Sequence, residues 1–110
     1  MSNVNFTDIQ KQAIVSLIVE MINADRVITI DELVASNTIN RELGITQELF
    51  LAGKAMDFDY ALEVVKQLAP EPTRFVAQQL VRIIDADGPD TAELDLLDYI
   101  ARATGLDQEL

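Results

Sequence analysis

Residues 23–32, with the sequence NADRVITIDE, and residues 85–93, with the sequence DADGPDTAE, form an acidic pattern that occurs twice, about half the chain apart. Each copy follows an apolar stretch of helical periodicity, and in each copy a glutamate, Glu32 or Glu93, opens a second such stretch. A glycine follows twelve residues after each of these glutamates. A pattern repeated at this length predicts one helix-loop-helix unit that is used twice.

Capping signals predict where the helices begin and end. Thr7 with Gln10, and Thr29 with Glu32, match the capping box, in which two side chains satisfy helix amides reciprocally. Single capping residues are expected at Thr46, Asp57 and Asp90. The predicted helices span about residues 8–24, 30–43, 47–54, 58–69, 73–84 and 91–104, and Gly44 and Gly105 end the second and the last.

Valine and isoleucine recur at spacings of three and four residues, and no stretch alternates as a strand would. The sequence therefore predicts an all-α fold: a compact bundle of about six helices built from two helix-loop-helix repeats with pseudo-twofold symmetry. A chain of 110 residues is expected to form a single domain, 1–110, with repeats at about 7–55 and 57–110.

Composition restricts the chemistry of the chain. It contains no cysteine and no histidine, which excludes disulfides, thiolate chemistry and the usual zinc ligands, so any metal would be a hard cation bound by oxygen. The net charge is −11, and residues 56–110 carry twelve acidic against four basic residues. This charge favours a cation or a basic protein partner and disfavours nucleic acid.

Membrane insertion is not expected. The apolar run at residues 13–22 is too short to span a bilayer and contains Glu20, and no basic segment typical of a secretory signal precedes it. We therefore expect a cytoplasmic protein.

On the repeated residues the chain resembles the tellurite-resistance TerB-like family, a domain that also occurs beside modules such as J-domain co-chaperones. The resemblance covers about residues 10–107 and is carried by Ala24-Asp25, Glu32, Leu43-Gly44, Ala86-Asp87-Gly88, Glu93 and Gly105-Leu106. Two departures are Arg26, which stands where the family usually has glycine, and a second loop that is shorter by one residue. The resemblance implies a compact, non-enzymatic helical module associated with stress response and with a divalent-cation role.

Seven carboxylates are candidate ligands for such a cation, calcium or magnesium. The acids at residues 85–93 are the preferred ligands, and those at residues 25–32 come next. In that order the set is Asp85, Asp87, Asp90, Glu93, Asp25, Asp31 and Glu32. Calcium takes six to eight oxygen ligands, and no lysine or arginine lies between Arg82 and Arg102 to neutralise the second group. The second loop is not an EF-hand, because its sixth and twelfth positions, counted from Asp85, hold Asp90 and Leu96 instead of glycine and glutamate. The alternative interpretation is structural, since the same carboxylates suit helix caps and the positive ends of helix dipoles.

No catalytic or cofactor-binding residue is predicted, because nothing around these acids supplies a nucleophile, an oxyanion hole or a substrate-positioning cluster. The predicted function is that of a non-enzymatic accessory protein, of the stress-response type, which binds a protein partner and a divalent cation through its acidic interhelical loops. The first alternative is a metal-independent acidic interaction domain. The second is a DNA mimic, which the bunching of charge around one loop disfavours.

Overall fold

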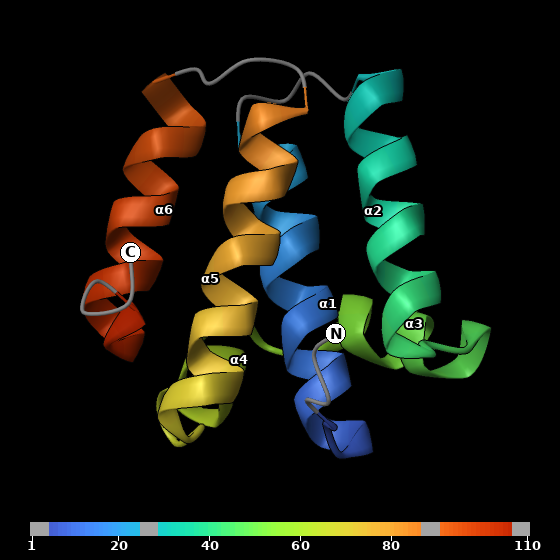
Figure 1. Cartoon of the computed structure of the whole chain (residues 1–110), viewed down its shortest axis with the longest axis vertical. Helices are drawn as coiled ribbons and strands as arrows, with labels where there is room; N and C mark the ends of the chain where they lie inside the picture. Colours follow the sequence, from blue (N-terminus) through green and yellow to red (C-terminus); the bar gives the residue numbers. More distant parts are fainter. Residues whose placement is uncertain (1–4, 25–28, 87–90, 107–110) are drawn as a thin grey trace.

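Six helices make up the described part of the chain, which comprises residues 5–24, 29–86 and 91–106 of the computed structural model (Figure 1). They are α1 (Asp8–Asn23), α2 (Ile30–Leu43), α3 (Gln47–Ala55), α4 (Phe58–Lys66), α5 (Pro70–Asp85) and α6 (Thr91–Thr104). These ranges contain no strand, so the predicted all-α bundle of about six helices is confirmed. None of these helices combines the length and the hydropathy needed to cross a bilayer.

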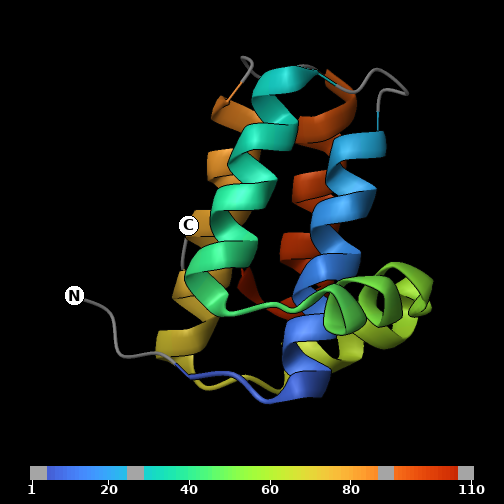
Figure 2. The ribbon, with the colours of Figure 1, turned by 90° about the vertical axis from the view of Figure 1, so that its right-hand side faces the viewer.

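The four longer helices form two hairpins. Helices α1 and α5 pack against each other at the centre, and α2 and α6 lie on opposite sides of this pair (Figures 1 and 2). Helices α1 and α5 end, and α2 and α6 begin, at the same end of the bundle, which we call the loop end. The short helices α3 and α4 pack against α1 towards the other end.

The two hairpins have matching dimensions. Helices α1 and α5 each contain 16 residues, and α2 and α6 each contain 14 residues. Gly44 and Gly105, which follow α2 and α6, have positive φ angles of 68° and 84°. The short helices do not follow this correspondence, because α3 comes after the first hairpin whereas α4 comes before the second. The pseudo-twofold relation between whole halves stays a prediction.

Helix α1 is the centre of the hydrophobic core. Its buried apolar side chains lie on several sides of the helix, and they are Ala13, Ile14, Val15, Leu17, Ile18, Met21 and Ile22. The other helices cover it, and Leu80 and Ile83 of α5 are fully buried beside it. Gly53 lets α3 approach α1 closely, since a Cβ atom there would lie 2.6 Å from the carbonyl oxygen of Gln12.

The boundary between α4 and α5 differs from the prediction. Helix α4 ends at Lys66 rather than near Ala69, and α5 begins at Pro70 rather than near Thr73. Proline disfavours helical geometry in the residue before it, and Ala69 is accordingly extended, with φ −65° and ψ 163°. Pro70 suits the first helical position, whose amide needs no partner within the helix. Thr73 therefore lies inside the first turn, where its Oγ1 donates a hydrogen bond to the Ala69 carbonyl oxygen.

Candidate functional site at the loop end

Glu32 lies in the first turn of α2 and forms a complete capping box with Thr29. The Glu32 amide donates to Thr29 Oγ1 at 3.1 Å, while the Thr29 amide and hydroxyl donate to Glu32 Oε1 at 3.1 and 3.2 Å. The Glu32 side chain is 1% exposed. The capping role predicted for this glutamate is thus confirmed, and the box fixes the direction of its carboxylate.

The second oxygen of this carboxylate is not used by the cap. Glu32 Oε2 is buried and has no hydrogen-bond partner among the described residues. Burying a polar atom without a partner costs about 1–3 kcal/mol, and more when the group is charged. A cation at this oxygen would compensate that cost, so the geometry of Glu32 fits the ligand role predicted for it.

Glu93 occupies the same position in the second hairpin, in the first turn of α6, and is also buried, at 2% exposure. It has interaction partners of its own. Glu32 and Glu93 lie on helices that stand on opposite sides of the central pair (Figure 1). The two buried glutamates therefore belong to two separate helix junctions at the loop end.

The other predicted ligands are divided between two places. Asp25, Asp87 and Asp90 lie outside the described residues. Asp31 and Asp85 are exposed, and both line a groove between α2 and α5. Within the ranges that the structure describes, no three acidic side chains come together in a group able to hold a metal ion.

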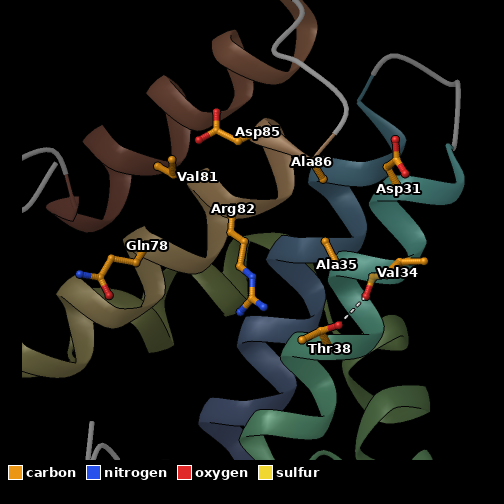
Figure 3. Close-up of a pocket in the computed structure, with 9 residues that line it drawn as sticks. All are labelled: Asp31, Val34, Ala35, Thr38, Gln78, Val81, Arg82, Asp85 and Ala86. Carbon is orange, nitrogen blue, oxygen red and sulfur yellow. Dashed lines mark hydrogen bonds between the residues drawn. The ribbon is translucent and has the colours of Figure 1, made fainter. Parts of the chain in front are cut away.

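The groove between α2 and α5, which we call the α2–α5 groove, has a volume of about 610 Å³ (Figure 3). Val34 and Ala35 from α2 and Val81 from α5 give it apolar walls. Asp31 and Asp85 stand on its opposite walls, near the loop end. The groove is not predicted from the sequence, in which residues 30–35 give an aliphatic run at the start of α2 as a signal.

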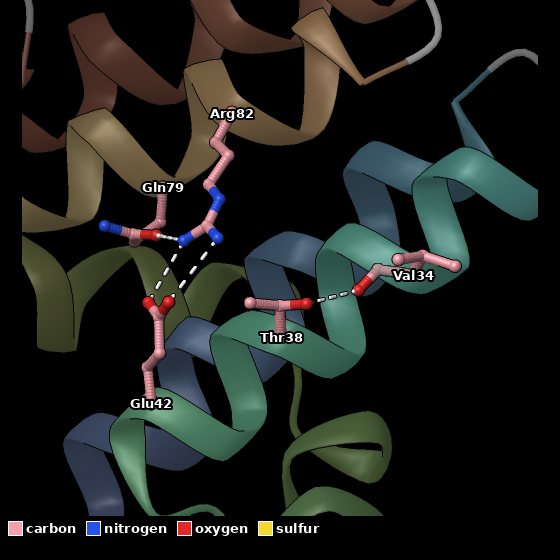
Figure 4. Close-up of polar contacts among 5 residues, drawn as sticks. All are labelled: Val34, Thr38, Glu42, Gln79 and Arg82. Atoms are coloured by element: carbon pink, nitrogen blue, oxygen red, sulfur yellow. Dashed lines mark hydrogen bonds and ion pairs between the residues drawn. The ribbon is translucent and has the colours of Figure 1, made fainter.

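An ion pair joins the two helices at the side of the groove away from the loop end (Figure 4). Arg82 of α5 holds Glu42 of α2 with both of its terminal nitrogens, Nη1 to Oε2 at 3.0 Å and Nη2 to Oε1 at 3.4 Å. Arg82 Nη1 also donates to Gln79 Oε1 at 3.3 Å. The positive charge of Arg82 is thus matched by the negative charge of Glu42, and the carboxylates of the groove are left unneutralised by it.

Comparison with known proteins bears on the fold. No protein-family model matches the chain, and no curated protein matches it significantly. Among solved structures the chain is similar to a protein of unknown function, PG1108 from Porphyromonas gingivalis W83, with a TM-score of 0.80 and 24% sequence identity over 93% of this chain and 86% of that one. The chain is therefore an all-α helical domain, and its architecture recurs in PG1108.

Proposed function

We propose that this chain is a cytoplasmic, non-enzymatic acidic accessory module of the TerB-like, tellurite-resistance and stress-response type. It binds a protein partner, and it holds a divalent cation, calcium or magnesium, at the loop end. The observation that supports the cation most directly is Glu32 Oε2, a buried carboxylate oxygen without a partner among the described residues. The resemblance at the two acidic repeats supports the family assignment.

Oxygen ligands are what calcium and magnesium require, and a cation is often the largest local charge in its site. The capping box holds Glu32 Oε1 through Thr29, so that Oε2 is presented in a fixed direction. In the proposed role, Asp25 would supply a further oxygen in the first repeat, and Asp87, Asp90 and Glu93 would be the corresponding ligands in the second; the three aspartates lie outside the described residues. The cation would neutralise repelling carboxylates and fix the helices on either side of each loop.

Thermal unfolding tests the cation. The melting temperature is measured on chelator-treated protein, alone and with millimolar calcium, magnesium or manganese at constant ionic strength. A ligand at about 100 times its dissociation constant stabilises the native state by about 2.7 kcal/mol. For a domain of this size we expect a saturable rise of roughly 10 °C with one ion.

Substitutions locate the effect. Glu32→Gln keeps an oxygen for the Thr29 hydrogen bonds and removes the charge, and Asp87→Asn does the same in the second loop. Each is expected to reduce the shift, whereas Glu48→Gln, an exposed acid in the first turn of α3, leaves it intact. Small, equal shifts with every ion would mean general screening of an acidic surface and would refute the cation site.

The metal-independent interaction domain is a second candidate, because two observations favour it. The capping box already accounts for Glu32 Oε1, and the described residues contain no metal-holding acidic group. In this case, binding of polylysine would weaken as salt increases and would be the same with and without chelator.

A further inference from the structure

Helix α2 buries mainly polar residues and exposes aliphatic ones, the reverse of the usual arrangement. Its buried residues are Glu32, Ser36 and Ile39, so two of the three are polar. Its first turns expose Ile30, Leu33 and Val34, at 78%, 48% and 58%. A surface helix normally turns its aliphatic residues towards the core, and contiguous exposed aliphatic groups are typical of an interaction surface.

Of these three exposed residues, Val34 lines the α2–α5 groove, whereas Leu33 lines a separate hollow beside α1 and α3. Ala35 lies beside Val34 in the groove, and Val81 is on the opposite wall (Figure 3). A shallow trough between two packed helices accepts a third helix, which places its aliphatic side chains between theirs. Apolar contact alone does not determine the charge of the partner helix.

The charges of the groove give that information. Asp31 and Asp85 stand on opposite walls, while Arg82 is paired with Glu42. Because Glu42, outside the groove, neutralises Arg82, the two aspartates leave the groove with a net negative charge, on a chain whose net charge is −11. A complementary occupant therefore carries positive charge next to its apolar side chains.

We propose that the α2–α5 groove binds an amphipathic, lysine- or arginine-bearing helix of a partner protein. Aliphatic side chains of that helix pack on Val34 and Val81, and a basic side chain reaches between Asp31 and Asp85. This inference rests on the partner-binding role proposed above and gives it a location and a partner chemistry. It requires no cation.

The same charges disfavour other occupants. Phosphate groups of a nucleic acid would meet two carboxylates at the loop end of the groove. A second copy of this chain would bring another net charge of −11 to the contact. Both remain as outcomes that the experiment can detect.

The test uses a defined probe: a fluorescein-labelled peptide of about 18 residues, long enough to form a helix. Leucines occupy positions i, i+3, i+4 and i+7, and lysines flank them. A second peptide has glutamate in place of every lysine. Binding to the full chain is measured by fluorescence anisotropy in the presence of chelator, so the result is independent of any cation.

Val34→Asp is the decisive variant. It removes an apolar contact but adds negative charge, so general attraction of a cationic peptide would increase. We expect binding of the lysine peptide to weaken at least roughly tenfold, because a central apolar anchor is lost. The matched control is Leu94→Asp, which changes an aliphatic residue of α6 that is also about half exposed, at 47% against 58% for Val34, and is expected to have little effect. Melting curves of both variants establish that they are folded.

The charge component is tested separately. Replacing both Asp31 and Asp85 with asparagine should weaken binding more than replacing Glu48 and Glu63, two exposed acids outside the groove, with glutamine. Binding that strengthens in Val34→Asp, weakens equally in Leu94→Asp, or persists with the glutamate peptide would overturn the proposal. So would a dimer in sedimentation that Val34→Asp dissociates, since the occupant would then be a second copy. Polylysine binding that ignores Val34→Asp would refute the groove and leave the partner-binding role standing.

Discussion

Replacing Gly53 with alanine changes the free energy of unfolding in opposite directions through packing and through helix propensity, so the sign of the measured change shows which effect dominates. It lies in α3 and faces α1, where an added Cβ atom would be 2.6 Å from the Gln12 carbonyl oxygen and 2.7 Å from Val15 Cβ. Carbon atoms pack best at about 3.5–4.0 Å, so the two helices would have to separate by roughly 0.8 Å. The nearest atom belongs to the backbone of a buried helix and cannot rotate away.

The expected free-energy change follows from two opposing contributions. Overpacking a well-packed contact costs about 1–3 kcal/mol, and a backbone clash at this distance belongs at the upper end. Alanine favours the helix over glycine by about 1 kcal/mol. We therefore expect Gly53→Ala to lower the free energy of unfolding by about 2 kcal/mol and the melting temperature by roughly 10 °C.

Chemical denaturation with an adjacent control checks this expectation. Ala52 is exposed in the same helix, and Ala52→Gly should lose only the helix propensity, about 1 kcal/mol. If Gly53→Ala instead raised the stability by about that amount, the close approach of α3 to α1 would be wrong.

Three smaller effects are expected in the same assay. Thr29→Ala removes the capping hydroxyl of α2 and should cost about 1 kcal/mol, most of which Thr29→Ser restores. Gly44→Ala places a Cβ atom at φ 68° and should cost about 1 kcal/mol without any steric clash, since the nearest atom, Lys11 Nζ, is 3.8 Å away. A double-mutant cycle on Arg82 and Glu42 should give a coupling energy below about 1 kcal/mol, because the two side chains are 41% and 50% exposed. A coupling energy several times larger would contradict this expectation.

Local signals in the sequence were sufficient for most of the fold. The capping box at Thr29 and the glycine at Gly44 gave the bounds of α2 correctly, because caps depend on residues within a few positions of each other. The predicted start of α5 near Thr73 is wrong because Pro70 occupies the opening turn of the helix, a position that proline suits, rather than preceding it.

The candidate site was less accessible to sequence reasoning. The burial of Glu32 could not be read from the sequence, since a capping glutamate is ordinarily exposed and its burial depends on how α2 packs. That Asp31 and Asp85 line one groove cannot be predicted for a related reason: these residues are far apart in the chain and face the groove only because α2 and α5 lie side by side. Periodicity describes one helix at a time, whereas such a groove is a property of a pair.

The contrast between α1 and α2 has a consequence for hydrogen exchange. Amides of α1 are enclosed by the other helices, so we expect them to exchange only when the whole domain unfolds. Ile39 is the only apolar residue among those that α2 fully buries, so its first turns can open without disturbing that core. We therefore expect the first turns of α2 to open more readily than α1, and a partner bound in the groove would slow exchange there first.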